Sequence, residues 1–196
     1  MYGGRKRCTV LDDGTISAFY GDTDYREDSA NAQVMIYQPK FYYQRIPLQT
    51  EGNRLGKIIN RDSIIISTTP QSGFKLHPLF INESGEEVDY VLLGAYESGI
   101  YSASSQGTYR YVYTNVDFNN DKLVSIVNTK PITGSSNMNM QKAEQLARNR
   151  GNGWHIYTIQ AESANQMLEA IEFGTLNGQS ILGKGVCNIT TEGNYN

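Results

Sequence analysis

The sequence predicts an α+β fold, with a β-rich N-terminal part followed by two adjacent helices near the C-terminal end. Three observations predict this class. Short apolar stretches alternate with turn residues through roughly the first 120 residues, a pattern that is typical of strands. Two stretches between residues 139 and 174 carry apolar residues at helical spacing. A glycine, the residue that most often stops a helix, follows each of these stretches.

The first two strands form a predicted hairpin. Residues 9–11 and 16–20 are rich in apolar and β-branched side chains, and the sequence Asp-Asp-Gly at 12–14 separates them. Aspartate and glycine in such a short connection favour the turn of a β-hairpin.

Four further stretches continue the β-rich part. Residues 34–37 and 41–46 are predicted strands, and Pro39 between them predicts an edge position or a bend because proline has no N–H to donate. Residues 58–67 contain three consecutive isoleucines and predict a short buried strand. Residues 88–97 predict a core strand.

The middle of the chain mixes polar loops with one aromatic strand. Residues 98–107 are rich in serine and predict an exposed loop. Tyr109, Tyr111 and Tyr113 then occupy alternate positions, which predicts a strand with one aromatic face. Residues 129–137 contain proline and glycine and predict a second loop.

The first helix is predicted at about residues 139–150. Arginines near its end suit the negative end of the helix dipole, and Gly151 supplies the left-handed stop. One face of this helix is apolar, formed by Met140, Ala143, Leu146 and Ala147.

The second helix is predicted to begin after Thr158, which is a suitable N-cap residue. Gly174 ends it. Its apolar face is formed by Ala164, Met167, Leu168 and Ile171.

Charge and hydropathy exclude two classes of partner. The chain has 17 basic and 20 acidic residues, a net charge of −3, so we expect no broad positive field that would attract nucleic acid or anionic lipid. No apolar run approaches the roughly 20 residues of a membrane helix, so we expect no membrane insertion. We also expect no secretory signal at the start of the chain.

The two cysteines, Cys8 and Cys187, lack the close spacing of zinc or redox sites. Two alternatives remain open for them, one disulfide that joins the two ends or two free buried thiols, and the lack of a signal favours free thiols. Asp22, Asp24, Glu27 and Asp28 cluster in a loop, but without the glycine and final glutamate of a calcium loop solvated charge is favoured. We therefore expect neither a metal nor a cofactor.

The sequence contains no catalytic motif that we can identify. The two histidines, His77 and His155, belong to no nucleophile or metalloprotease motif, although paired carboxylates for glycoside cleavage remain an alternative. His77 precedes a proline and is expected in a fixed extended turn. Trp154 is expected to pack in the core. The residues to which we assign structural roles are Trp154, Gly151, Gly174 and Gly183.

Tyrosine is the unusual residue of this composition, with 14 Tyr beside 6 Phe and one Trp. Tyrosine offers contact area and a hydroxyl at low entropic cost, which suits binding surfaces, although β-rich domains also favour it. For a sugar ligand the candidate residues are Tyr101, Tyr109, Tyr111, Tyr113, Asn177 and Gln179. The alternatives are aromatic cross-strand pairs for the tyrosines and a loop pinned by the two amides.

Five segments of the chain form an ordered set: VMIYQPKFYYQRI at 34–46, GFKLHPLFI at 73–81, YVLLGAYE at 90–97, RGNGWHIY at 150–157 and IEFGTLNGQSILGKG at 171–185. In this order they resemble the C-type-lectin-like domain of bacteriophage tail fibres, in a fold group that includes formylglycine-generating enzymes. The resemblance implies a β-rich subdomain at 1–87 and a partial lectin-like domain at 88–196. Relatives continue into a glycine- and tryptophan-rich second half, so the resemblance implies a truncated domain or one completed by another chain.

The resemblance implies a non-enzymatic phage virion component. We expect a tail-fibre or receptor-binding domain that adheres to a host surface glycan or protein, contacts other virion proteins and forms a homo-oligomer, with a trimer as the first expectation. Two alternatives remain open. One is an enzyme related to sulfatase-modifying factors or polysaccharide-cleaving tail proteins, and the other is a collar or capsid decoration protein without a receptor.

Overall fold

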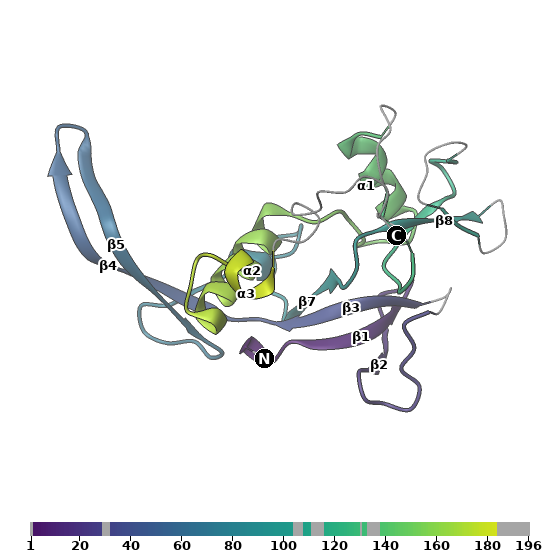
Figure 1. The fold of residues 1–196 in the computed structure, drawn as a ribbon, viewed down its shortest axis with the longest axis horizontal. Helices are drawn as coiled ribbons and strands as arrows, with labels where there is room; N and C mark the ends of the chain where they lie inside the picture. Colours follow the sequence, from purple (N-terminus) through teal and green to yellow (C-terminus); the bar gives the residue numbers. More distant parts are fainter. Residues whose placement is uncertain are drawn as a thin grey trace. The chain divides into compact units, whose positions relative to one another are not determined.

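A computed structural model describes residues 2–28, 32–103, 108–110, 116–129, 131–132 and 138–183. The described chain has mixed α+β structure, with β-rich sheets in the N-terminal part and a few helices in the C-terminal part (Figure 1), as predicted. The chain divides into two compact units, each built from separate stretches. Unit 1 comprises residues 1–4, 38–91 and 159–187, and unit 2 comprises 5–37, 92–158 and 188–196. The division between residues 87 and 88 stays a prediction.

Most of a four-stranded sheet belongs to unit 2 (Figure 1). Its strands are β1 (Lys6–Leu11), β2 (Ile16–Phe19), β3 (Ala32–Pro39) and β7 (Tyr90–Gly94), in the order β2-β1-β3-β7. The predicted hairpin is confirmed, since β1 and β2 pair antiparallel around the Asp-Asp-Gly turn. Gly14 has φ 85°, the left-handed conformation that glycine adopts without strain.

The core of unit 2 lies on this sheet. Cys8, Val10 and Met35 are buried there, and a larger set of half-buried side chains packs around them. Cys8 is a free thiol, and burial raises its pKa to about 11. Cys187 lies outside the described residues. The surrounding side chains are Ile16, Phe19, Tyr37, Leu92 and Trp154.

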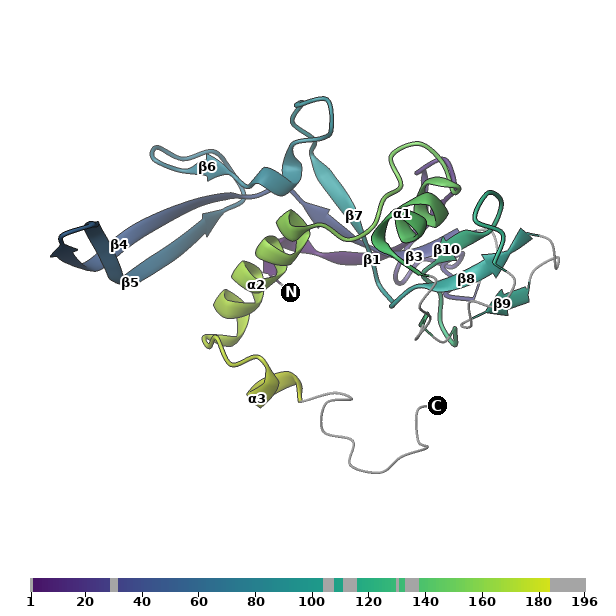
Figure 2. The same cartoon turned by 90° about the horizontal axis from the view of Figure 1, so that it is seen from above.

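A second sheet in unit 2 supports the first helix (Figure 2). Its strands are β8 (Gly99–Ser102), β9 (Thr108–Arg110) and β10 (Lys122–Val124), in the order β10-β8-β9. Helix α1 (Met140–Arg148) packs against β10. The predicted first helix is confirmed, and the Asn139 side chain caps it by accepting the backbone N–H of Lys142 at 2.9 Å.

The exposed loop predicted at 98–107 is wrong over residues 99–102, and the core strand predicted at 88–97 is confirmed as a strand but only partly buried. Residues 99–102 form buried β8 instead of an exposed loop. Buried Asp121 makes this possible, because its carboxylate accepts the backbone N–H groups of Ala103 and Asp117 at 3.0 and 2.9 Å. Strand β7, predicted in the core, is half-buried. It comes last in the strand order, where β3 is its one described neighbouring strand.

A charge cluster ties the β1–β2 turn to the end of α1 within unit 2. Asp12 makes ion pairs with Arg150 and with Lys122, the latter at 2.7 Å. The Arg150 side chain is 3% exposed and also donates to the carbonyl of Leu123 at 2.8 Å. Its guanidinium lies 5.5 Å from the ring centroid of Trp154. A buried arginine depends on such partners, because an uncompensated buried charge is costly.

Replacing Asp12 by Asn should therefore destabilise unit 2. The amide keeps the shape but removes the negative charge that Asp12 presents to the buried Arg150, so we expect a loss of about 1–3 kcal/mol in the free energy of unfolding by urea. Asp13→Asn is the matched control, since the exposed Asp13 accepts a hydrogen bond from the Thr15 backbone. Equal losses for the two variants would contradict the role of Asp12.

Unit 1 is built on a long hairpin. Strand β4 (Tyr42–Asn53) pairs antiparallel with β5 (Gly56–Ser67) and with β6 (Lys75–Leu76), in the order β5-β4-β6. As Pro39 predicts, β3 ends there and β4 begins after a break. The β4–β5 register shifts on both sides of Gln49, which marks a bulge beside Pro47.

The core of unit 1 lies where α2 (Ile159–Phe173) crosses the base of this hairpin. Phe41, Phe80, Ala164 and Leu168 are buried there, and Met167 packs against them. The predicted second helix is therefore confirmed with most of its predicted face. The unit also contains the short helices η1 (Tyr2–Gly4), η2 (Pro78–Phe80) and α3 (Gln179–Leu182). None of the described helices is long and apolar enough to span a membrane.

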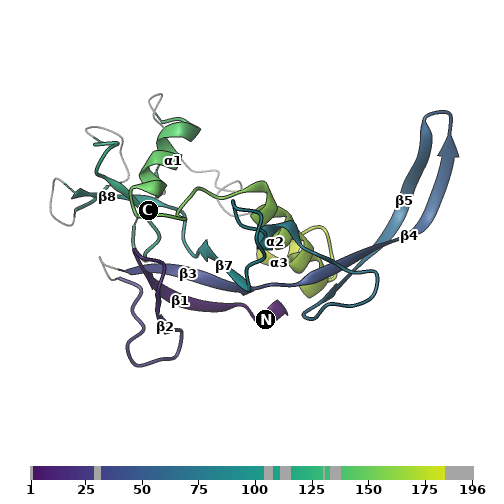
Figure 3. The same cartoon turned by 180° about the vertical axis from the view of Figure 1, so that it is seen from behind.

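The strand predicted at residues 58–67 is present, but the prediction that it is short and buried is wrong. Strand β5 has 12 residues, and Ile64 and Ile65 are 40% and 42% exposed, whereas Ile66 reaches the core. Successive residues of a strand face opposite sides, so three isoleucines in a row cannot share one core. At about 3.4 Å per residue the hairpin is roughly 40 Å long, whereas the 15 residues of α2 span roughly 22 Å. Figures 1 and 3 show the distal hairpin extending past α2.

Replacing Leu168 by Ala should destabilise unit 1. This side chain is 3% exposed, and its loss leaves a cavity beside Phe41 and Phe80, so we expect a cost of about 2–5 kcal/mol. Chemical denaturation followed by circular dichroism measures it. Leu176→Ala is the matched control, because Leu176 is 95% exposed and its truncation should change stability by less than about 0.5 kcal/mol. A small effect at Leu168 would contradict this core assignment.

Candidate functional site

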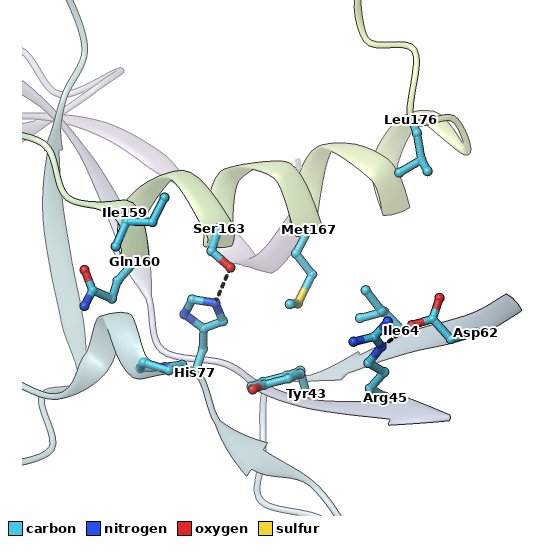
Figure 4. A pocket seen from close by; sticks show the side chains of 11 residues that line it. Tyr43, Arg45, Asp62, Ile64, His77, Ile159, Gln160, Ser163, Met167 and Leu176 are labelled. Carbon is cyan, nitrogen blue, oxygen red and sulfur yellow. Dashed lines mark hydrogen bonds and ion pairs between the residues drawn. The ribbon is translucent and has the colours of Figure 1, made fainter. Parts of the chain in front are cut away.

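The described part of unit 1 contains an open groove between α2 and the β4–β5 hairpin. Its volume is about 560 Å³. Figure 4 shows α2 on one side and the hairpin on the other, with His77 between them. The lining residues are Tyr43, Arg45, Asp62, Ile64, His77, Pro78, Ile159, Gln160, Ser163, Met167 and Leu176.

The strand side of the groove follows from the alternation of β-structure. Tyr43 and Arg45 are two residues apart on β4 and share one face, and Ile64 lies opposite Arg45 in the register. Arg45 and Asp62 form an ion pair at the rim (Figure 4). Both of these side chains are partly exposed, so water screens the pair and it contributes little to stability.

The helix side follows from the 3.6-residue period. Ile159, Ser163 and Met167 are spaced by four residues, so they lie on one face of α2, beside the face that holds Ala164 and Leu168 in the core. Helix α2 therefore presents two neighbouring stripes, one to the core and one to the groove. Ile159 is 77% exposed, so the groove stripe carries apolar surface that its own unit leaves uncovered.

His77 forms the floor of the groove. Its extended backbone, φ −67° and ψ 136°, confirms the predicted extended turn. The side chain is 2% exposed and packs against Phe41 and Tyr43, with ring centroids 5.0 and 5.6 Å apart. Its Nδ1 accepts the backbone N–H of Leu79 at 3.2 Å and so caps η2. Burial lowers the pKa of His77, so the ring is neutral at pH 7.

The structure brings His77 beside a serine, a pair that sequence analysis did not find. The distance from His77 Nε2 to Ser163 Oγ is 3.5 Å (Figure 4). Because Nδ1 accepts the Leu79 N–H, the single proton of the neutral ring resides on Nε2. Nε2 is then a donor toward Ser163 and cannot take its proton, which is the opposite of what a nucleophilic serine requires. The pair is arranged to position side chains.

The chemical character of the groove suits an apolar polypeptide segment. Its walls are largely aliphatic, from Ile64, Ile159, Met167 and Leu176, with the Arg45–Asp62 pair at the rim. A sugar site would need flat aromatic faces with several amides or carboxylates directed at hydroxyl groups, and Tyr43 is the one tyrosine among the lining residues.

Tyr101 and Tyr109, two of the tyrosines predicted for sugar binding, belong to unit 2. Tyr101 of β8 is the register partner of Tyr109 of β9. Tyr101 is half-buried. Tyr111 and Tyr113 lie outside the described residues. The structure therefore brings two of the four predicted tyrosines together on neighbouring strands, and neither lines the groove.

Asn177 and Gln179 lie at the turn between α2 and α3, next to Leu176 of the groove. The backbone of Asn177 holds this turn: its N–H donates to Thr175 Oγ1 at 3.0 Å and its carbonyl accepts the Ser180 N–H at 3.1 Å. Gln179 begins α3 and is exposed.

The residues assigned structural roles have identifiable positions. Trp154 packs against the core of unit 2 and donates from Nε1 to the carbonyl of Asp12 at 2.9 Å. A Cβ at Gly151 would lie 2.9 Å from that same oxygen, so the close approach requires glycine. Gly174 and Gly183 follow α2 and α3 with φ of 65° and 88°.

The acidic loop is held by hydrogen bonds and ion pairing. Glu27 accepts hydrogen bonds from the hydroxyls of Tyr25 and Tyr96, both at 2.6 Å, and pairs with Arg7 at 2.7 Å. These tyrosine hydrogen bonds, followed by Arg7, lower the pKa of the Glu27 carboxyl. Within the described residues, no group of three or more His, Cys, Asp or Glu side chains has the arrangement of a metal site.

Comparisons with known proteins give no match. No family model matches the sequence, no curated protein matches it, and no solved structure matches its fold.

The groove was not predicted from the sequence, because the prediction for the second helix used only the face that packs in the core. The signal was the second stripe, Ile159, Ser163 and Met167, which shares Met167 with the predicted core face. On the hairpin side of the groove the signal was the run of isoleucines in β5, because alternate residues of a strand face opposite sides and part of the run must lie outside the core. The spatial proximity of His77 and Ser163, 86 residues apart, had no sequence signature.

The depressed pKa of His77 predicts a pH dependence of stability. The folded pKa lies below the ordinary value of about 6.5, so near pH 6 the unfolded chain binds more protons. Stability should be complete above about pH 6.5 and fall as the pH decreases toward the folded pKa. His77→Asn retains a capping oxygen but does not titrate, and should reduce this dependence in urea melts between pH 5 and 8.

His155→Asn is the matched control for this experiment, because it leaves His77 in place and should retain the dependence on pH. An unchanged pH profile in His77→Asn, with the variant folded, would contradict the assignment.

Proposed function

We propose that this chain is a non-enzymatic component of a phage virion, a tail-fibre or receptor-binding domain with a partial C-type-lectin-like core. It adheres to a host surface glycan or protein and contacts other virion proteins. We place it in the tail or fibre as a homo-oligomer, with a trimer as the first arrangement to test.

The observation that carries the proposal is the exposed aliphatic surface of the β4–β5 hairpin. A two-stranded ribbon without cover is marginally stable in water, and aliphatic side chains are exposed on both faces of this one. A subunit of a larger assembly presents such a surface because another chain covers it. The residues are Leu48, Leu55, Ile58, Ile59, Ile64 and Ile65, with exposed fractions from 39% to 91%.

Two features of the sequence support adhesion in particular. Five segments resemble phage tail-fibre domains in the same order, and the chain is rich in tyrosine, which suits binding surfaces. The helix pair adds no support, because α1 belongs to unit 2 and α2 to unit 1, whereas a lectin-like core would set both against one small sheet.

The two alternatives differ in what the structure offers them. For an enzyme, the His77–Ser163 pair has the wrong tautomer for serine activation, and no other candidate pair emerges from the described residues. The same exposed hairpin also supports a collar or decoration protein without a receptor, since it indicates assembly with another chain and does not indicate a particular receptor.

Purified phage particles should contain this chain, detectable by mass spectrometry and by antibody labelling of the tail in electron microscopy. The isolated full chain should bind host cells or a glycan array and should compete with phage adsorption, because adhesion at one site is shared by the virion and the free subunit.

Three results separate the alternatives. Absence from purified particles would contradict any virion role. Presence in particles without competition for adsorption would favour the decoration protein. Turnover of a glycan or a sulfatase peptide, abolished by replacing one acidic residue, would favour the enzyme.

A further inference from the structure

A loop of unit 2 carries an exposed aromatic ring. Residues 20–26, Tyr-Gly-Asp-Thr-Asp-Tyr-Arg, follow β2 directly (Figure 1), and we call them the Tyr20 loop. Tyr20 is 72% exposed, more than any other tyrosine whose side chain is described. Its ring meets that of Tyr25 edge to face, with centroids 5.4 Å apart and 81° between the planes. At this exposure, such a contact leaves at least one face of the Tyr20 ring open to solvent.

The backbone of the Tyr20 loop is held by hydrogen bonds of its own. The Asp22 carboxylate accepts the backbone N–H of Phe19 at 2.8 Å, and the backbone N–H of Tyr25 donates to the Asp22 carbonyl at 3.2 Å. The Arg26 guanidinium donates to the carbonyls of Thr23 and Tyr25 at 2.9 and 2.7 Å. The exposed ring is therefore presented by a preorganised loop, so a ligand bound there pays little to order it.

Glu27, directly after the loop, anchors it to the rest of unit 2. Its carboxylate accepts hydrogen bonds from the hydroxyls of Tyr25 and Tyr96 and pairs with Arg7 of β1. Its backbone carbonyl accepts the N–H of Val127 at 3.1 Å. These contacts give Glu27 the role of a positioning residue, which sets the loop in place and does not itself face a ligand.

The loop also carries polar groups that its own unit does not use. Within the described part of the chain, the Tyr20 hydroxyl and the Asp24 carboxylate make no hydrogen bond or ion pair. Asp22 accepts the Phe19 N–H through one carboxylate oxygen, Oδ2, and Arg26 makes both of its hydrogen bonds through Nη1. Carboxylate oxygens accept and guanidinium N–H groups donate, so the loop offers both kinds of partner to a hydroxyl group.

We propose that the Tyr20 loop is a carbohydrate site that binds a neutral pyranose. The C–H face of the sugar packs on the open face of Tyr20, the carboxylates of Asp22 and Asp24 accept hydrogen bonds from its hydroxyls, and Arg26 donates to a sugar oxygen. An anionic sugar is disfavoured, because residues 20–26 carry two carboxylates against one guanidinium, a net charge of −1.

The composition of the loop favours a sugar over a protein partner. Residues 20–26 contain no Leu, Ile, Val, Met or Phe, so the apolar surface of the loop comes from its two tyrosine rings. The centre of a protein interface is built from several apolar side chains and is depleted of charge. A single ring beside carboxylates matches a pyranose instead, whereas the aliphatic β4–β5 hairpin of unit 1 has the character of a protein contact.

The inference deepens the proposed function and rests on it in one respect, that the saccharide belongs to a host surface. It selects a glycan where the proposed function admits a glycan or a protein, and it places the contact in unit 2. One small site of this kind binds weakly, and several copies in an oligomer would multiply the affinity.

The first test measures saccharide binding by the full chain with saturation-transfer NMR. The probes are neutral oligosaccharides of glucose, galactose, mannose and N-acetylglucosamine, and oligogalacturonides are the anionic counterparts of the galactose series. At least one neutral saccharide should bind, and oligogalacturonides should bind at least about fivefold more weakly than that saccharide.

Variants of the loop then test the assigned contacts. Tyr20→Ala removes the stacking face and should weaken binding about tenfold or more, whereas Tyr20→Phe keeps the face and should weaken it less than about threefold. Tyr157→Ala is the matched control, because Tyr157 is 53% exposed, belongs to unit 2 and lies outside the loop. Asp24→Asn should weaken binding about fivefold, and Asp28→Asn, at an exposed position after the loop, should leave it unchanged.

Three results would overturn the inference: no binding of any neutral saccharide, equal losses for Tyr20→Ala and Tyr157→Ala, or tighter binding of the anionic saccharides. A Tyr20→Ala chain that competes with phage adsorption as well as the unchanged chain would also overturn the site and leave the proposed function standing. A chain that binds a saccharide through Tyr20 but is absent from particles would contradict the proposed function and leave the site in place.

Discussion

The length of the β4–β5 hairpin relative to its core is the constraint on which unit 1 depends. The buried cluster around Phe41, Phe80 and Leu168 lies at the base of the hairpin, and α2 is too short to cover the remainder. Apolar side chains therefore continue along the ribbon beyond any support from their own chain. The groove lies beside this cluster, between α2 and the hairpin.

Unit 2 is held together by a different kind of interaction. Beside its apolar core, the Asp12 carboxylate joins the β1–β2 turn to the buried Arg150 after α1. Trp154 adds a ring over the guanidinium and a hydrogen bond to the backbone of the same aspartate. The Asp12 side chain thus holds Arg150, which is 138 positions away in the sequence. The backbone carbonyl of Asp12 holds Trp154. The tryptophan stabilises this unit through polar contacts as well as through packing.

Local patterns predicted the first hairpin and both helices, because the Asp-Asp-Gly turn, the helical spacing of apolar residues and the stop at Gly174 act within a few residues. Burial was predicted less well. The serine-containing β8 is buried because a distant residue, Asp121, accepts the backbone N–H that follows the strand. Most isoleucines of β5 are exposed because the strand extends beyond the core. The groove brings together His77 and Ser163, which are 86 residues apart in the sequence, and no local sequence pattern predicts this contact.

The bulge at Gln49 beside Pro47 has a consequence for copies that have just left the ribosome. Strand β5 is the outer strand of its sheet, and a straight apolar edge of this kind is the usual template for amyloid-like stacking. The bulge increases the local twist of the ribbon. This twist opposes a ladder that would otherwise grow along the β5 edge while the apolar side chains of the ribbon are still uncovered.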